Sequence, residues 1–293
     1  MYFYKPGVTI QPMERWITCE LIFFDCDSTL STIEGSDELA RMKGKELRVG
    51  VLTDKAMNGD LDLAEVYGKR LKAIRPTRLQ LEAIKDRYAE TLVEDAQEVI
   101  DALHFIKRKV FIISGGLLDA VRGFGEHLGV RPECIRAVEL EYDELAGEWW
   151  RYNDHSSEGQ QRYLDYGEGP LTVTSGKPDI VRELAGDTWG RRMMIGDGAS
   201  DLATRGNGVD IFVGFGGVVA REQVKKGADV FIHCASISPV LPLAAGALGL
   251  ELVTGTSHEA VFRKGLDLAL AGDNVTFHDE TMRRAFQNEF ETA

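Results

Sequence analysis

The sequence predicts an α/β fold, with a Rossmann-like, mostly parallel sheet as the core and a small inserted helical cap domain. Short apolar runs alternate along the chain with amphipathic helical patterns, an order that is typical of parallel sheets. A long charged segment with helical periodicity and no strong strand signal separates the first two apolar runs. This segment favours an insertion of helices into the sheet domain.

The apolar runs supply the predicted strands in chain order. We predict strands at 21–24, 110–113, 192–195, 211–215 and 228–232, from the segments LIFF, VFII, RMMI, IFVGF and ADVFI. Helical patterns predict helices at 95–108, 117–128, 178–185 and 218–226. In open sheets of this kind, ligands bind at the carboxyl ends of the strands, so the polar residues that follow these runs are the first candidates for a site.

The helical insertion gives the predicted core two separate stretches of chain. The core covers 1–36 and 95–240, the helical cap covers 37–94, and a helical C-terminal extension covers 241–293. Within the core, residues 141–176 are rich in turn-forming, acidic and aromatic residues. That composition predicts an irregular or hairpin excursion from the sheet.

Composition argues against several classes of partner. The net charge of −13 disfavours nonspecific nucleic-acid binding, which needs clustered Lys and Arg. The four cysteines, Cys19, Cys26, Cys134 and Cys234, lack the spacing of a zinc site or a disulfide framework, which favours reduced thiols in a cytoplasmic protein. The N-terminal residues lack an apolar signal core and no apolar stretch is long enough to span a bilayer, so we expect no membrane partner.

Acidic residues follow two of the predicted strands. Asp25 and Asp27 come after the first strand, and Asp197 and Asp201 come after the third. Carboxylates this close raise one another's pKa unless a cation is present, and oxygen ligands suit a hard cation such as Mg2+. We expect the acids at the rim of the sheet rather than in its core. One aspartate then serves as nucleophile towards phosphorus and another as general acid and base.

Groups that bind phosphoryl oxygens are predicted near these acids. Ser114, Gly115 and Gly116 follow the second strand and are expected to open a helix, whose free N–H groups bind anions. Lys177 precedes Pro178, which fits the first turn of a helix and places the ammonium near a positive helix end. Each motif alone is more often a turn or a loop. Their occurrence together and in this order favours a phosphoryl-transfer site.

These ordered motifs resemble those of the haloacid dehalogenase superfamily of aspartate-nucleophile phosphatases. The matching motifs are DCDST at 25–29, SGG at 114–116, Lys177 and GDGASD at 196–201. Over about residues 20–235, further segments resemble the phosphoserine phosphatases within that superfamily. They are IEGSDELA at 33–40, KAMNGDLDLAEVYGKRL at 55–71, FIISGGL at 111–117, and FVGFGG at 212–217 with Arg221 and Gln223.

The resemblance implies a role for each matching residue of the catalytic centre. Asp25 is implied to be the nucleophile and Asp27 the acid and base. Mg2+ is implied to be held by Asp25, the backbone carbonyl of Asp27 and Asp197, with Asp201 in support. Ser114 and Lys177 are implied to bind the phosphoryl oxygens.

The resemblance also implies a substrate end of the site. Glu34 matches the acid that faces a serine ammonium, Arg70 matches the cap arginine that binds its carboxylate, and Gly115 lies beside them. Met57 and Gly59 fall where the family shapes the cap wall, whereas Leu63 stands where the family has an aromatic residue. The residues alone leave another interpretation open, with Glu34 as an acid in the first turn of a helix and Arg70 as a solvated helix charge.

The resulting hypothesis is a Mg2+-dependent phosphomonoesterase that hydrolyses O-phospho-L-serine to L-serine and phosphate through an aspartyl-phosphate at Asp25. The alternative with the same chemistry is a phosphatase or phosphotransferase for another small phosphorylated metabolite, such as phosphocholine, phosphoethanolamine or a sugar phosphate. A noncatalytic binding module with the same fold is a further alternative. The C-terminal extension has no counterpart in the resemblance and leaves the oligomeric state open, with a homodimer as one option.

Overall fold

The computed structural model describes residues 15–57, 60–143 and 161–291. Within them, a seven-stranded sheet has the strand order β3-β2-β1-β6-β7-β8-β9. Neighbouring strands pair in parallel, except that β9 pairs antiparallel with β8. The predicted α/β class with a mostly parallel sheet is confirmed.

Each of the five predicted strands is present in this sheet. β1 (Leu21–Phe24) and β7 (Ile211–Phe215) have the predicted bounds, and three others differ slightly: β2 (Lys109–Leu117), β6 (Arg192–Gly196) and β8 (Val230–Ile232). The four residues of β1 are fully buried, as expected for an apolar strand in the middle of a parallel sheet. The two edge strands, β3 (Ile135–Val138) and β9 (Val275–Phe277), were not predicted from the sequence.

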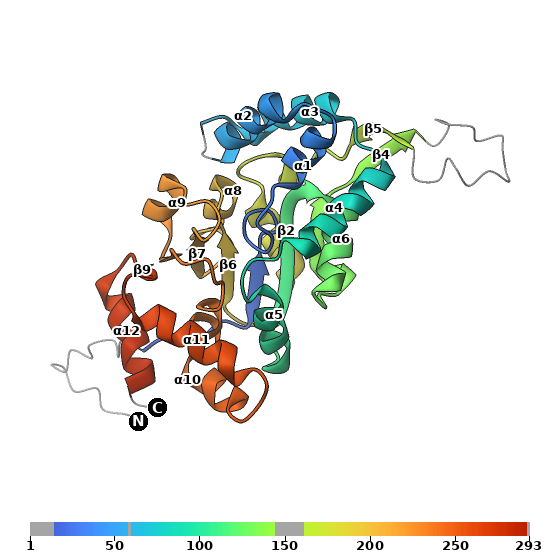
Figure 1. The fold of residues 1–293 in the computed structure, drawn as a ribbon. Coiled ribbons are helices and arrows are strands. Elements are labelled where there is room, and N and C mark those ends of the chain that lie inside the picture. Colours follow the sequence, from blue (N-terminus) through green and yellow to red (C-terminus); the bar gives the residue numbers. More distant parts are fainter. Residues whose placement is uncertain (1–14, 58–59, 144–160, 292–293) are drawn as a thin grey trace.

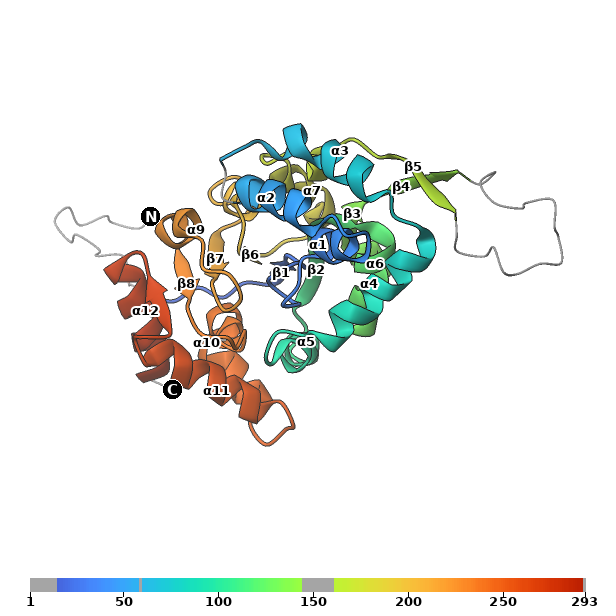
Figure 2. The same ribbon diagram turned by 45° about the horizontal axis from the view of Figure 1, so that its top comes forward.

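Four helices fill the insertion between β1 and β2: α1 (Gly35–Met42), α2 (Glu46–Met57), α3 (Leu63–Ile74) and α4 (Arg78–Glu90). We call these the inserted helices. Local signals set their starts, since the Asp62 side chain accepts the Ala64 N–H before α3, and Thr77 forms a capping box with Gln80 before α4. Figures 1 and 2 show α1, α2 and α3 above the strands, at the end where β1 leads into the insertion.

Further helices and one antiparallel strand pair lie between the remaining strands. The helices are α5 (Ala96–Phe105), α6 (Leu118–His127), α7 (Lys177–Ala185), α8 (Ala199–Leu202) and α9 (Glu222–Gly227), with 3-10 turns at Pro132–Cys134 and Pro170–Thr172. α9 begins four residues later than predicted. In the 141–176 excursion, β4 (Leu140–Asp143) and β5 (Arg162–Tyr166) form an antiparallel pair, and 144–160 lie outside the described residues.

The C-terminal extension is built into the edge of the sheet. It contains the helices α10 (Val240–Val253), α11 (Glu259–Leu270) and α12 (Glu280–Glu291), and also the short strand β9, which was not predicted. β9 pairs with β8 in the register Val230↔Phe277. Trp16, which is 5% exposed, packs edge-on against Phe277 and Phe286 and donates from Nε1 to the Leu243 carbonyl at 2.9 Å. The division of the chain into core, cap and extension stays a prediction.

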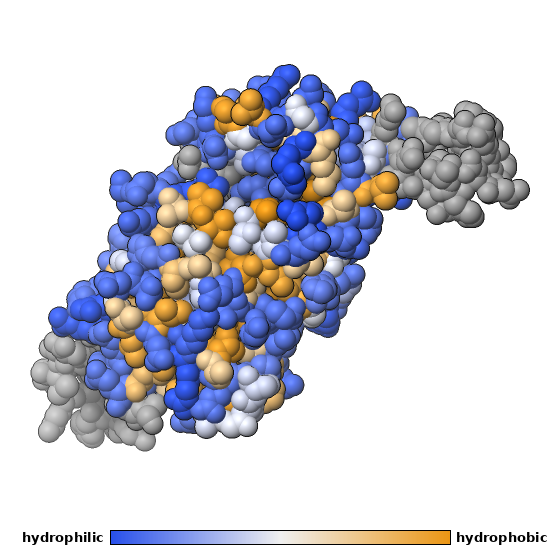
Figure 3. All heavy atoms as spheres, in the orientation of Figure 1, coloured by the Kyte–Doolittle hydropathy of each residue, from blue (hydrophilic) through white to orange (hydrophobic). Residues whose placement is uncertain are grey.

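The surface of the described residues carries scattered apolar side chains. Figure 3 shows apolar residues over the middle of one face, surrounded by polar ones. Large exposed apolar side chains lie on separate elements, among them Leu47 on α2, Trp189 before β6 and Leu248 on α10, so none of them alone marks a docking face. No helix in the described part of the chain has the length and apolar character that a bilayer crossing requires.

Candidate active site

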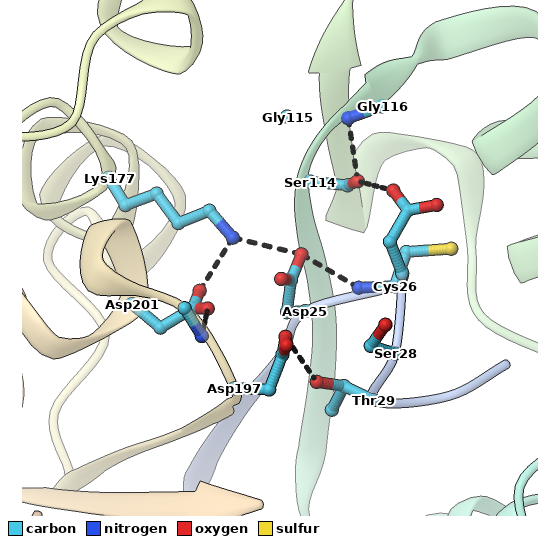
Figure 4. A network of polar contacts seen from close by, with 12 residues as sticks. Asp25, Cys26, Ser28, Thr29, Ser114, Gly115, Gly116, Lys177, Asp197 and Asp201 are labelled. Atoms are coloured by element: carbon cyan, nitrogen blue, oxygen red, sulfur yellow. Dashed lines mark hydrogen bonds and ion pairs between the residues drawn. The ribbon is translucent and has the colours of Figure 1, made fainter. Parts of the chain in front are cut away.

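Three neighbouring strands carry the predicted chemical groups at one edge of the sheet. Asp25 directly follows β1, Ser114 lies near the end of β2, and Asp197 directly follows β6. The Asp25 N–H donates to the Ile195 carbonyl at 2.9 Å, which extends the pairing of β1 with β6 as far as the acid. Figure 4 shows these side chains converging with those of Lys177 and Asp201. The fold therefore brings residues from distant parts of the sequence into one cluster.

The acids lie at the ends of these strands, as expected, but they are buried. Asp25 is 3% exposed, Asp27 is 7% exposed, and Asp197 and Asp201 are not exposed at all. The inserted helices account for the burial of Asp25 and Asp27, because side chains of α1, α3 and α4 line the same pocket as these two acids. Buried carboxylates require cations or hydrogen-bond donors nearby.

Lys177 supplies one such cation. It is the first residue of α7, one residue earlier than the predicted start of this helix, and its Nζ lies 2.9 Å from Asp25 Oδ1 and 2.6 Å from Asp201 Oδ1. Burial works to lower the pKa of Lys177, but Asp201 and Asp25 raise it more strongly, so the net shift is upward. The ammonium therefore stays charged and offsets part of the charge of both acids.

Three acids form a set that could hold a metal ion. Carboxylate oxygens of Asp25, Asp197 and Asp201 lie within 4.8 Å of one another. Burial raises the pKa of Asp197 to about 7, although Arg221 opposes the shift, and burial together with Asp25 raises the pKa of Asp201 well above its ordinary value. A buried donor set made only of carboxylates fits a hard divalent cation such as Mg2+.

Asp27 has a different environment, made of hydrogen-bond donors. Its Oδ1 accepts the Gly35 N–H at 2.7 Å and the Tyr88 hydroxyl at 2.7 Å, and its Oδ2 accepts the Ser114 hydroxyl at 3.3 Å. Burial raises the pKa of Asp27, and the hydrogen bond from Tyr88 lowers it in part. A carboxyl group whose pKa is raised in this way is suited to gaining and losing a proton.

The Ser114–Gly116 segment does not open a helix, which corrects the prediction. These residues belong to β2, and α6 begins only at Leu118. The strand continues because Leu117 still pairs with Val138 of β3, after a register shift that begins at Ile113. Gly116 is needed for another reason, since a Cβ there would lie 2.9 Å from Asp27 Oδ2. The Gly116 N–H donates instead to Ser114 Oγ at 2.8 Å.

The pocket has a cationic group and an anionic group beyond the acids and Lys177. Arg70 is 7% exposed, which excludes a solvated helix charge. Its Nη1 donates to Thr53 Oγ1 at 3.1 Å, and its Nε is buried without a partner among the described residues. Glu34 lines the same pocket, accepts the Ser28 hydroxyl at 2.9 Å and caps no N–H of α1 with its side chain. Burial, with Asp27 and Asp197, raises the pKa of Glu34 well above its ordinary value.

The cap wall differs in detail from the expectation. Met57 ends α2, but its side chain lies outside the described residues, as does Gly59. Leu63 begins α3 and lines the pocket. One turn further along, Tyr67 also lines the pocket, and its hydroxyl donates to the Gly115 carbonyl at 2.9 Å. The guanidinium carbon of Arg70 lies 5.3 Å from the centre of the Tyr67 ring. An aromatic ring is thus present, supplied by the next turn of the helix.

Three residues that contact the site had no role predicted from the sequence. Arg221 is 5% exposed and joins the two acidic groups, with Nε 3.0 Å from Asp197 Oδ2 and Nη2 3.6 Å from Glu34 Oε1. Its position after β7, the next strand end along the sheet, was the signal available. Tyr88 and Thr53 lie within inserted helices, where no motif marks them.

Comparisons with known proteins bear on the identity of this site. No family model matches the chain. The phosphoserine phosphatase of Mus musculus is 30% identical over 216 residues, which cover 73% of this chain and 89% of the mouse protein. The chain belongs to the phosphoserine phosphatase family. The chloroplastic phosphoserine phosphatase of Arabidopsis thaliana is also 30% identical, over 222 residues that cover 75% of this chain and 70% of the plant protein.

Solved structures of phosphoserine phosphatases share the fold. One, described as a phospho-aspartyl intermediate analogue of phosphoserine phosphatase, has a TM-score of 0.63 and 26% identity over 77% of this chain and 98% of its own. A substrate-bound phosphoserine phosphatase complex has the same TM-score and identity over 76% of this chain and 96% of its own. The family predicted from the motifs is therefore confirmed. The name of the plant relative shows that the family is not confined to one compartment, so a cytoplasmic location stays a prediction, as does a homodimer.

Proposed function

We propose that this member of the phosphoserine phosphatase family is a Mg2+-dependent phosphomonoesterase that hydrolyses O-phospho-L-serine to L-serine and phosphate. The observation that carries the proposal is a single pocket with four groups on its wall. Asp25 and Lys177 suit the phosphoryl group. Glu34 and Arg70 suit an ammonium and a carboxylate.

In the proposed reaction, a carboxylate oxygen of Asp25 forms a bond to phosphorus while the bond between phosphorus and the serine oxygen breaks. Asp27 gives its proton to the departing serine oxygen. In the second step, Asp27 takes a proton from a water molecule that attacks phosphorus, and the bond to Asp25 breaks to release phosphate. The Cys26 N–H, which donates to Asp25 Oδ1 at 2.8 Å, supports the orientation of the nucleophile.

Lys177 and Ser114 are the proposed ligands of the phosphoryl oxygens, with Gly115 beside them. Asp25, the Asp27 backbone carbonyl and Asp197 would hold Mg2+, supported by Asp201. When bound, the metal ion would neutralise charge on the phosphoryl oxygens. Side chains of the inserted helices line this pocket, which supports a first reaction step with little water around the phosphoryl group.

Substrate choice rests chiefly on Arg70. Its Nε is buried without a partner among the described residues, an arrangement that costs free energy unless a ligand atom pairs with it. A carboxylate is the natural partner of a guanidinium. Phosphocholine and phosphoethanolamine carry no carboxylate and would leave this Nε unpaired. The substrate's ammonium would in turn favour the charged form of Glu34.

The test is phosphate release with Mg2+ from O-phospho-L-serine and from two esters that each lack one of its groups. Phosphoethanolamine lacks the carboxylate, and 3-phosphooxypropionate lacks the ammonium. We expect phosphoserine to be preferred over both, and Asp25→Asn to abolish release from all three. A preference for phosphoethanolamine would refute phosphoserine as the substrate but would retain the proposed phosphatase reaction. Absence of turnover of any ester would favour a binding module.

A further inference from the structure

Tyr88, in the last turn of α4, places its hydroxyl group against a core carboxylate. The side chain is not exposed at all, and its hydroxyl lies 2.7 Å from Asp27 Oδ1. The two residues are 61 positions apart in the sequence, and α4 is one of the inserted helices. The inserted helices therefore contribute a hydrogen-bond donor to the carboxylate that the proposed reaction uses as acid and base.

The residues around the Tyr88 hydroxyl leave room for it. A Cβ at Gly35 would lie 2.1 Å from the Tyr88 hydroxyl oxygen, so only glycine at position 35 leaves room for it. The Gly35 N–H donates to the same Asp27 oxygen at 2.7 Å. On its other side, the Tyr88 ring packs against Phe124 of α6, with 5.3 Å between ring centres. The direction of the hydroxyl is thus fixed by packing.

The two oxygens of Asp27 become inequivalent as a result. Oδ1 accepts two short hydrogen bonds, from Tyr88 and Gly35, whereas Oδ2 has only the longer contact of 3.3 Å with Ser114. A carboxyl oxygen whose lone pairs are both engaged by donors is a poor place for a proton, so the proton of the neutral acid belongs on Oδ2.

We propose that Tyr88 is a positioning residue for the acid and base step, which orients Asp27 so that Oδ2 carries the proton to the leaving oxygen. The proposal rests on the proposed function, since it needs Asp27 as the acid. In the step, Asp25 bonds to phosphorus, the bond from phosphorus to the alcohol oxygen breaks, and the proton on Asp27 Oδ2 passes to that oxygen. The competing interpretation is a buried core tyrosine whose hydroxyl bonds to the nearest acceptor.

The leaving group separates the two interpretations. Ethyl phosphate releases a strongly basic alkoxide that needs the proton, whereas acetyl phosphate, of similar size, releases weakly basic acetate that does not. The value of kcat/KM reports the steps up to phosphoryl transfer to Asp25. General acid catalysis contributes about 10²- to 10⁴-fold, so we expect Tyr88→Phe to lower kcat/KM about 10- to 100-fold for ethyl phosphate and less than about threefold for acetyl phosphate.

Controls use the same protein and the same assay with Mg2+. Tyr67→Phe removes the other buried hydroxyl of this pocket, which bonds to the Gly115 carbonyl rather than to Asp27, and should affect the two esters equally. In an Asp27→Asn background, Tyr88→Phe should cause no further loss on ethyl phosphate. Thermal unfolding of Tyr88→Phe, which keeps the ring, checks that the variant is folded.

Equal losses on the two esters, no loss on either, or a further loss in the Asp27→Asn background would each overturn the proposal. A wild-type preference for an ester other than phosphoserine would refute the substrate assignment alone, because the comparison of ethyl with acetyl phosphate still reports on Tyr88. Absence of wild-type turnover of every ester would refute both.

Discussion

Replacement of Arg70 by methionine should change which phosphate esters the protein accepts. Methionine keeps an apolar chain of similar reach beside the Tyr67 ring and removes the guanidinium. In the folded protein Arg70 is 7% exposed and its Nε has no partner among the described residues, so a bound carboxylate would pair with the guanidinium in a site with little water. Removal of one partner of a buried, hydrogen-bonded charge pair costs about 2–5 kcal/mol.

The expected effect follows from that range. Because about 1.4 kcal/mol corresponds to a tenfold change in rate, we expect Arg70→Met to lower kcat/KM for O-phospho-L-serine by about 30- to 4,000-fold. Phosphoethanolamine, which lacks the carboxylate, should change by less than about threefold, because its transition state never pairs with the guanidinium. Phosphate release measured on both substrates with Mg2+ gives the comparison directly.

Two further measurements check that the change in substrate preference comes from the lost contact with the carboxylate. Lys69→Met removes the same charge from an exposed position of the same helix and should leave the ratio of the two substrates unchanged. Arg70→Met should alter the free energy of unfolding by less than about 1 kcal/mol. It removes an Nε that is buried without a partner among the described residues, and Thr53, which loses its 3.1 Å contact with Arg70, keeps its 2.8 Å hydrogen bond to Asp37. Equal losses on phosphoserine and phosphoethanolamine would refute the carboxylate assignment.

Two other predictions concern stability. Without Mg2+, the free energy of unfolding should fall as pH rises from about 5 to 7, because burial raises the pKa of Asp197 to about 7 and the folded state keeps a proton that the unfolded chain has lost. Added Mg2+ should oppose this fall, and thermal melts with Mg2+ or a chelator would show it; stability that rises over this range would contradict it. Trp16→Ala should cost about 3–5 kcal/mol in denaturant unfolding, since Trp16 packs Phe277 and Phe286 against the sheet. A cost under about 1 kcal/mol would mean that other contacts hold the extension.

The central strands could be predicted from the sequence because burial on both faces leaves a continuous apolar run. LIFF at 21–24 and IFVGF at 211–215 are buried and were placed without error. The edge strands lack that pattern. In β3, Arg136 interrupts the apolar run, and β9 has only three residues, of which Thr276 is exposed. Such strands form because a partner strand lies beside them, which a local pattern does not record.

The positions of the acids could be predicted as well, but their burial could not. Ligands of parallel sheets bind at the carboxyl ends of the strands, and this rule placed Asp25 and Asp197 together because it depends only on the order of strands and turns. Their exposure depends on how closely the inserted helices approach, which is a tertiary property. The error at Ser114–Gly116 has the same origin, since Leu117 extends β2 by pairing with Val138 of a strand that the sequence did not reveal.

Tyr88 shows how much of a buried contact the sequence pattern of a single helix can predict. Leu81, Ile84 and Tyr88 are the buried residues of α4, and their spacing of three and four is that of a packed helix face. The pattern alone therefore predicts a core residue. A buried phenol, however, must find an acceptor, and this core contains several buried carboxylates. A tyrosine on the inward face of a helix inserted beside strand-end acids is thus expected to bond to one of them. Which acid it reaches is decided by Gly35, whose missing side chain leaves space beside Asp27.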